Sequence, residues 1–275
     1  MKSGLSLVRP LLLAGLFMAS APALAINCGK ASTAAEKLIC SDKKTVAADA
    51  ELNRAYSAIL KQAPDADVRT MLMDSQKRWV EARDKALDRL ITDPDAVSDD
   101  KTVGEIVREL ILNRAAQFKE TRKGSATPDM ISRVVQQKQF QAQFTGGEFA
   151  GYWTSCDVLP RDYDYACFAI RHYQNNDRVC SVDESWATGA VYVKRYVANV
   201  VAGKPKVIAS CSFNSSDEAC ASVGDTKANW NRQPKAPEYV YASEPLPKID
   251  GEIDASDDFE WVKACLTDPA YPPAQ

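Results

Sequence analysis

The side chains best suited to chemistry in this chain are eight cysteines and a single histidine. His172 would have to be the base of any Ser-His-Asp or Cys-His site, and it lies within a run typical of a β-strand. We interpret it as a surface or hairpin residue rather than a general base. The sequence has no Cys-x-x-Cys and no histidine pair, the usual ligands of zinc. We therefore expect no catalytic residue, no metal and no cofactor.

A second candidate is the acidic run Asp250–Asp258, which reads DGEIDASDD and alternates side-chain oxygens as calcium loops do. It lacks the glycine at position six and the glutamate at position twelve of an EF-hand loop. The sequence favours a solvated acidic loop over a calcium site. Acid pairs of the kind that glycosidases use occur in any acidic protein, so their presence does not distinguish a glycosidase from a protein without enzymatic activity.

The start of the chain is typical of a secretory signal peptide. Lys2 and Arg9 precede a short apolar run at residues 11–18, and Ala23 and Ala25 give the small residues of a cleavage site. We expect residues 1–25 to be removed and the product to be a soluble periplasmic protein. Asn27 precedes the first cysteine, so the sequence predicts no lipid anchor. No later run is long and apolar enough to span a bilayer.

The cysteines divide unevenly along the chain. An even number in an exported protein predicts four disulfides. Two cysteines lie in the N-terminal half and six in the C-terminal half, so each half can close its own bridges, which favours two domains: Cys28, Cys40; Cys156, Cys167, Cys180, Cys211, Cys220, Cys265.

Charge divides in the same way. Without residues 1–25 the chain has 32 basic and 37 acidic residues, a net charge of −5. Residues 26–123 carry a net +1, and the remainder carries −6. No basic block interleaved with aromatic residues is present, so a nucleic acid is not expected as a partner. The acidic second half would suit a basic protein, although mild acidity is also common among secreted proteins.

Helices are predicted through the first half. Thr33 with Glu36, and Thr102 with Glu105, have the spacing of capping boxes at helix N-termini. Asp93-Pro94 ends the third helix. Apolar residues recur at three- and four-residue spacing along three helices: Leu52, Tyr56, Ile59, Leu60; Val68, Leu72, Trp79, Ala86, Leu90; Ile106, Leu110, Ala115, Phe118. Residues 26–123 should form an all-α antiparallel domain with Tyr56 and Trp79 as core anchors.

These elements carry a motif that resembles the N-terminal domain of the LprI-like lysozyme inhibitors, over about residues 28–122. The motif reads C-x-K-A-x-T-x-x-E-K-x-I-C-x-D, then D-x-E-L-x-x-x-Y, then Q-x-x-W-x-x-x-R-D. Its positions here are Cys28, Lys30, Ala31, Thr33, Glu36, Lys37, Ile39, Cys40, Asp42; Asp49, Glu51, Leu52, Tyr56; Gln76, Trp79, Arg83, Asp84. Many members have further cysteines after the R-D pair, which this chain lacks. Cys28–Cys40 is then the one pairing available within the domain.

The resemblance implies a non-enzymatic protein that binds a lysozyme or another muramidase and occludes its sugar cleft. The alternative is a cell-envelope interaction or immunity protein with a different target. We expect Arg83 and Asp84 to pair with neighbouring helices, and residues 26–123 alone to retain binding.

The C-terminal half, residues 145–275, changes to a period of two. We expect strands at residues 149–158, 165–173, 178–182, 190–201 and 206–213, with shorter ones at 239–242 and 259–264. They should form a disulfide-bridged antiparallel meander, closed as a small barrel or sandwich. Residues 124–144 are a linker or an ambiguous segment, helical at first and strand-like at Phe140, Ala142 and Phe144. The fold class is therefore α+β with two domains.

One short stretch of this half has a second resemblance. Thr188, Gly189 and Tyr192 are similar to the S-G-x-x-Y loop of the membrane-bound and periplasmic C-type lysozyme inhibitors, which enters the enzyme cleft. A turn leading into a strand explains the same residues and is the favoured interpretation.

Overall fold

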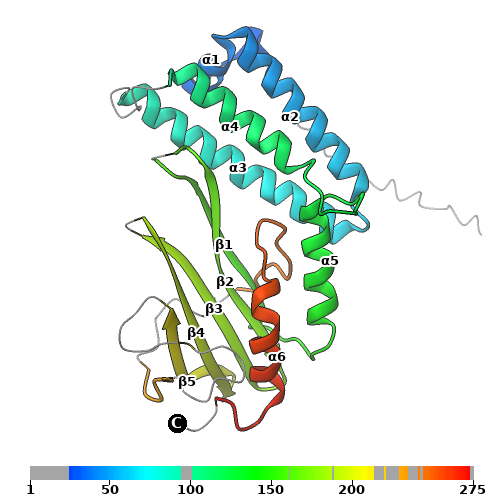
Figure 1. The fold of residues 1–275 in the computed structure, drawn as a ribbon, viewed down its shortest axis with the longest axis vertical. Coiled ribbons are helices and arrows are strands. Elements are labelled where there is room, and N and C mark those ends of the chain that lie inside the picture. Colours follow the sequence, from blue (N-terminus) through cyan, green and yellow to red (C-terminus); the bar gives the residue numbers. More distant parts are fainter. Residues whose placement is uncertain are drawn as a thin grey trace, which may run out of the picture.

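The computed structural model describes residues 25–93, 101–160, 162–187, 189–213, 220, 229–234, 241 and 244–272. Helices at one end of the molecule pack against an antiparallel sheet (Figure 1), so the α+β class is confirmed. The predicted signal peptide up to Leu24, Thr188, and the expected strand at 239–242 apart from Tyr241 lie outside the described residues.

The N-terminal region is helical, as predicted. A 3-10 turn and five helices follow one another: η1 (Cys28–Lys30), α1 (Ala34–Cys40), α2 (Lys43–Gln62), α3 (Ala66–Thr92), α4 (Val103–Gln117) and α5 (Asp129–Gln141). Both capping boxes are present, at the starts of α1 and α4. All the apolar positions predicted for α2, α3 and α4 are buried. None of the described helices is long and apolar enough to cross a bilayer.

The helical core forms around Trp79 and Tyr56. Trp79 is fully buried, and the Tyr56 ring lies 5.6 Å from that of Phe118. Val158 and Ile249, from the C-terminal half, belong to the same apolar cluster. The helical core therefore includes side chains from both halves of the chain.

Five strands form one meander in the order β1-β2-β3-β4-β5. They are β1 (Gly151–Val158), β2 (Tyr165–Asn175), β3 (Arg178–Ala187), β4 (Ala190–Val201) and β5 (Lys204–Phe213). The expected closure into a barrel or sandwich is wrong, because the sheet is a single open one. Asn176 and Ala202 adopt positive φ at the β2–β3 and β4–β5 turns, which short hairpins favour.

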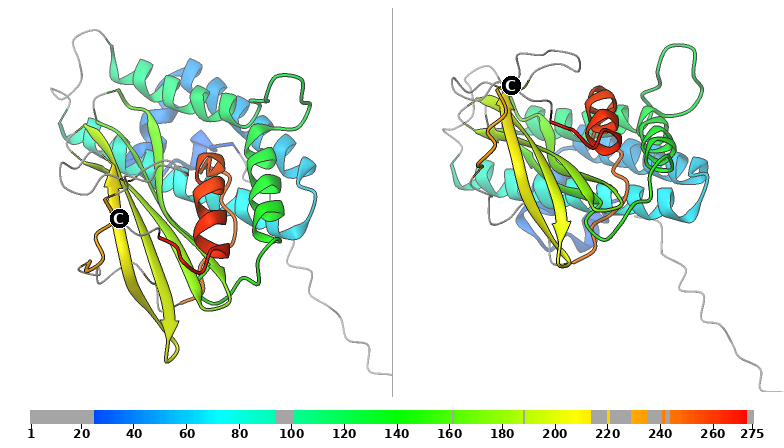
Figure 2. Two further views of the ribbon diagram at one scale, coloured as in Figure 1. Left: turned by 60° about the horizontal axis from the view of Figure 1, so that its bottom comes forward. Right: turned by 90° about the horizontal axis from the view of Figure 1, so that it is seen from below.

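The expected strand at 259–264 is also wrong, since these residues belong to α6 (Phe259–Thr267), which follows the short turn η3 (Ser256–Asp258). α6 buries Trp261, Val262, Cys265 and Leu266 at helical spacing. In Figures 1 and 2, α6 lies between the sheet and α5. Strand and helix patterns are hard to distinguish in so short an apolar run.

The ambiguous segment is resolved as helix. α5 continues to Gln141, and the residues after it form a turn rather than a strand. Phe140 explains the apolar pattern, because its ring stacks on Phe259 of α6 at 4.0 Å and meets the Tyr173 edge at 5.7 Å.

All eight cysteines form disulfides, and each half closes its own, as predicted. The pairs are Cys28–Cys40, Cys156–Cys167, Cys180–Cys265 and Cys211–Cys220. Cys180–Cys265 fixes α6 to β3, and Cys156–Cys167 joins directly opposed residues of β1 and β2.

Candidate functional site

The acidic run is not the solvated loop that we expected. Asp250 is 2% exposed, Asp258 is 7% exposed, and the Glu252 side chain is 1% exposed, whereas Asp254 and Asp257 face solvent. Sequence reasoning missed this because the arginines that neutralise the run lie far away in the chain.

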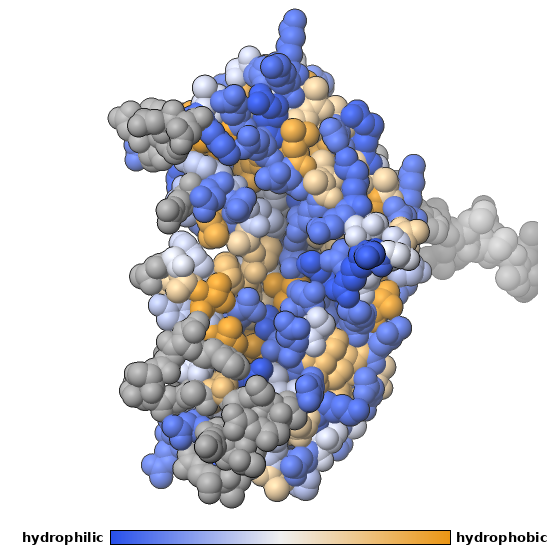
Figure 3. Space-filling view, viewed as in Figure 1, coloured by the Kyte–Doolittle hydropathy of each residue, from blue (hydrophilic) through white to orange (hydrophobic). Residues whose placement is uncertain are grey.

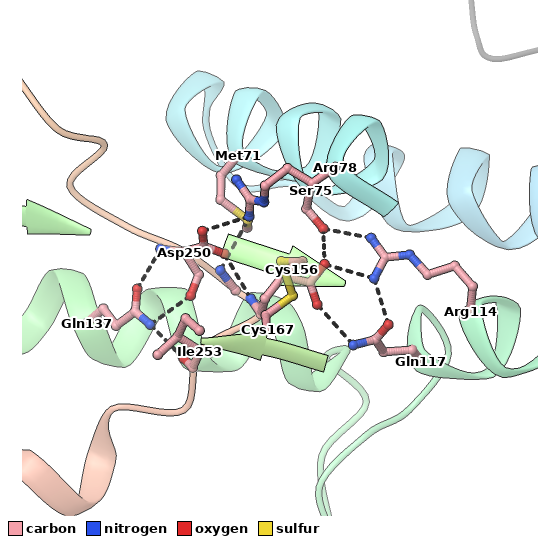
Figure 4. Close-up of polar contacts among 12 residues, drawn as sticks. Met71, Ser75, Arg78, Arg114, Gln117, Gln137, Cys156, Cys167, Asp250 and Ile253 are labelled. Atoms are coloured by element: carbon pink, nitrogen blue, oxygen red, sulfur yellow. Dashed lines mark hydrogen bonds and ion pairs between the residues drawn. A yellow bond between two sulfur atoms is a disulfide. The ribbon is translucent and has the colours of Figure 1, made fainter. Parts of the chain in front are cut away.

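Glu252 is held by the helices (Figure 4). Its carboxylate pairs with Arg114 of α4 at 2.8 Å, accepts a bond from Ser75 of α3, and accepts another from Gln117 at 3.0 Å. Arg114 also donates to Ser75 at 2.7 Å and to Gln76 at 3.2 Å. The guanidinium and the carboxylate are therefore both buried and both satisfied.

Asp250 is held by α3 and α5. Its carboxylate accepts from Arg78 at 2.7 Å, and its backbone exchanges hydrogen bonds of 2.9 Å with the Gln137 amide. Gln137 donates also to the carbonyl of Ile253. Burial raises the pKa of the Asp250 carboxyl, and the charge of Arg78 opposes that shift.

The turn between these two acids requires a glycine. A Cβ on Gly251 would lie 2.4 Å from Cγ and 2.9 Å from the carbonyl oxygen of Met130 in α5. The Gly251 N–H points at the sulfur of Met71 in α3. The segment is thus wedged between α3 and α5, and we call it, with its partners, the junction: residues 250–253 with Ser75, Arg78, Arg114, Gln117 and Gln137.

The junction is built for cohesion rather than turnover. Each buried carboxylate faces a guanidinium, and solvent reaches almost none of Glu252. Among the described residues, no group of three or more His, Cys, Asp or Glu side chains could hold a metal ion. The arrangement joins the helical region to the C-terminal half through charge-assisted hydrogen bonds.

The family motif residues divide into inward and outward sets. Trp79 is buried with the Arg83 guanidinium 5.2 Å from its ring centre, and Gln76 reaches Arg114 in the junction. Arg83 pairs with its neighbour Asp84 at 2.7 Å, so the expected pairing with other helices is wrong. Leu52 and Tyr56 are buried, and Lys30 and Lys37 are exposed.

Asp49, another motif residue, has an unexpected neighbour. It is 4% exposed, and its carboxylate accepts a 2.8 Å hydrogen bond from the backbone nitrogen of Ile26. Asn53 donates to the same oxygen at 3.3 Å. The start of the predicted mature chain is thereby held against α2.

His172 lies in the β2–β3 hairpin, opposite Ser181, but it is not a surface residue, so that part of the interpretation was wrong. It is 2% exposed, its Nδ1 lies 2.7 Å from the hydroxyl of Ser181, and its ring stacks on Tyr241 at 5.1 Å. The prediction that His172 lies in a strand is confirmed. Its side chain is nevertheless buried, because both faces of an open sheet can be covered by other parts of the chain.

The possible inhibitory loop lies at the β3–β4 turn. Gly189 has a φ of 80°, Tyr192 is 37% exposed, and β4 begins at Ala190. This agrees with a turn leading into a strand. An inhibitory role for the loop stays a prediction.

The described surface has two larger hollows, of which the first borders the junction at Arg78 and Asp250. One, of about 620 Å³, lies between α3, α5 and residues 247–250. The other, of about 640 Å³, opens between β2 and β3 and includes Trp153, Asp183 and Trp186. Sequence reasoning singled out none of these three residues, although two tryptophans and an acid in alternating strands could have indicated a recognition surface.

Residues 27–137 match the family model described as "Lysozyme inhibitor LprI", which confirms the resemblance for the N-terminal region. The match ends within α5 and leaves the sheet outside it. No curated protein and no solved structure matches the chain significantly.

Proposed function

We propose that this chain is a soluble periplasmic protein that binds a lysozyme-like peptidoglycan hydrolase and inhibits it by occupying the sugar cleft, without turnover. The observation that carries the proposal is the match of residues 27–137 to an inhibitor family. The described helices support it, because their buried side chains share one apolar core that includes Trp79.

Charge and disulfides agree with this role. The net charge of −5 after residue 25 would attract a basic hydrolase and speed the encounter. Four disulfides suit an oxidising compartment such as the periplasm. The buried junction keeps the C-terminal half in a fixed position beside the helices, so both halves can contribute to one binding surface.

One observation favours the alternative, an envelope interaction or immunity protein. The sheet has its own large cleft and lies outside the family match. A partner recognised mainly by the sheet need not be a lysozyme.

The test is muramidase activity with and without the purified protein, under non-reducing conditions. We expect stoichiometric inhibition of at least one enzyme among c-, g- and i-type lysozymes. No effect on any of the three would favour the alternative.

A further inference from the structure

The sheet divides at the end nearest the helices. β2 and β3 pair only as far as Ile170 and Asp183. Beyond that point the two hairpins separate: the β1–β2 hairpin turns toward α3, and the β3–β4 hairpin turns away from α3 (Figure 1). The facing edges, residues 165–169 of β2 and 184–187 of β3, are therefore not paired with each other. Such edges present backbone N–H and C=O groups to any chain that enters the gap.

The gap is the cleft of about 640 Å³. Trp153 and Trp186 line it and are 52% and 38% exposed, unusually high for side chains of this size. In the face drawn in Figure 3, hydrophobic surface, in orange, gathers beside hydrophilic surface, in blue. The charged residues of the cleft are one arginine and three acids: Arg89, Asp157, Asp183 and Glu184.

Three of these charges are neutralised within the molecule. Arg89 lies 3.2 Å from Asp157, and Glu184 pairs with Arg171 at 2.7 Å. Asp183 differs, because its carboxylate makes no hydrogen bond or ion pair with the part of the chain that the structure describes, although the residue is only 8% exposed. Within the part of the chain that the structure describes, the cleft therefore contains one nearly buried carboxylate that has no direct hydrogen-bond or ion-pair partner.

The position of Asp183 relates it to Trp153. Asp183 pairs across the sheet with Ile170, and Ile170 pairs with Trp153, so the three side chains share one face in one row. A cation entering over Trp153 toward Asp183 would gain both a cation–π contact and an ion pair. Lys194 lies opposite Asp183 on β4 but is exposed and makes no ion pair with it.

We propose that this cleft binds an extended, basic segment of a protein partner. The segment adds its backbone to the facing edges of β2 and β3, which are not paired with each other, as peptides do in strand addition. It places a lysine or arginine against Asp183 beside Trp153. This deepens the proposed function, on which it rests, by naming the surface that contacts the hydrolase.

The test uses the full chain and an enzyme that it inhibits. We expect Asp183→Asn and Trp153→Ala each to weaken binding about tenfold or more by calorimetry, because a buried charge pair and an aromatic anchor are lost. Glu81→Gln, at an exposed position of α3, is the matched control and should bind as the wild type does. Asp183→Asn should not lower the melting temperature, since it removes an unpaired buried charge, which separates recognition from folding.

Unchanged inhibition by both variants would overturn the cleft proposal and leave the proposed function standing. If the wild type inhibits no hydrolase, the probe is a peptide of alternating arginine and valine with both termini blocked. Its binding is measured by the change in tryptophan fluorescence. Binding that Asp183→Asn abolishes supports the cleft without inhibition. Binding of peptidoglycan oligosaccharides instead, lost in Trp153→Ala, would contradict a basic protein segment as the occupant.

A second inference concerns the Ile26 nitrogen, which lies 2.8 Å from the buried carboxylate of Asp49. We infer that cleavage after Ala25, as the sequence predicts, converts this amide into a charged α-amino group. The ammonium then forms an ion pair with Asp49, and processing stabilises the helical region. Two opposite charges this close attract each other, and the burial of Asp49 reduces screening of that attraction by solvent.

The comparison is between the chain beginning at Ile26 and the chain that keeps Ala25. We expect the shorter chain to melt at a higher temperature, and Asp49→Asn to remove the difference. If the two chain lengths melt at the same temperature with Asp49 in place, the inference is overturned. A mature N-terminus that mass spectrometry places elsewhere than at Ile26 would overturn it too.

Discussion

At the scale of single residues, we expect the largest loss of folding stability when the buried pair of Arg114 and Glu252 is broken. Arg114→Ala leaves an uncompensated carboxylate in a site that solvent hardly reaches. Breaking one partner of such a pair costs about 3–5 kcal/mol. Urea unfolding should show this loss, whereas Lys119→Ala should cost far less, because solvent screens the exposed pair that Lys119 forms with Glu51. A loss for Arg114→Ala as small as that for Lys119→Ala would contradict the role of the junction.

Asp183 gives a prediction about pH. Burial raises the pKa of its carboxyl above the ordinary value, and the charges of Lys194 and Arg171 oppose the shift. A raised folded pKa means that the native state holds the proton more tightly, so stability is lost as pH rises from about 4 through the folded pKa. Asp183→Asn should therefore stabilise the protein most at pH 7 and hardly at about pH 3.5. Melting curves at the two pH values check this; an equal effect at both would contradict it.

Sequence reasoning placed the apolar residues well and the buried charges poorly. Trp79 and Tyr56 follow from helical spacing alone, which depends on near neighbours. Glu252 could not be paired with Arg114 from sequence, because they lie 138 positions apart and only the folded chain brings them together. Arg114 did give one signal, since it lies between Leu110 and Phe118 on a face that is otherwise apolar.

At the scale of elements, the disulfides that fix α1 and α6 should differ in importance. Cys28–Cys40 closes a loop with a sequence separation of 12, and Cys180–Cys265 one with a separation of 85. The loop-entropy relation gives about 3 kcal/mol for the first and about 4.6 kcal/mol for the second. Paired Cys→Ala substitutions, compared by urea unfolding, should show the larger loss for Cys180 with Cys265. The reverse order would show that native packing, not loop length, dominates.

The elements that were predicted wrongly are those whose structure depends on packing against distant parts of the chain. The strand expected at 259–264 is a helix because Trp261 and Cys265 pack on the covered face of the sheet. The sheet stays open because α6 covers that face, which removes the need for closure. β4, by contrast, was predicted to the residue, since its alternation is long and two turns delimit it.

At the scale of the whole molecule, the junction makes the two halves interdependent. Residues 26–123 expressed alone would keep Arg114 without Glu252, and the helical core without Val158 and Ile249. That fragment is therefore a weak test of which half binds, and substitutions in the full chain are preferable. The division into two domains and the binding capacity of residues 26–123 stay predictions.

Because of the junction, we expect the full chain to unfold as one cooperative unit. Hydrogen exchange should show similar protection in α3, which contributes Ser75 and Arg78 to the junction, and in β2 of the C-terminal half. Early loss of protection in the sheet alone, with the helices intact, would show that the halves are independent.

We propose that the whole molecule inhibits by occupying the sugar cleft of a hydrolase. The most direct measurement is an inhibition titration of a susceptible lysozyme by the full chain from Ile26, repeated with increasing concentrations of a peptidoglycan oligosaccharide substrate. Cleft occlusion predicts a one-to-one end point, an apparent affinity that weakens as the substrate concentration rises, and recovery of intact inhibitor. Inhibition independent of substrate concentration, or consumption of the inhibitor, would contradict cleft occlusion.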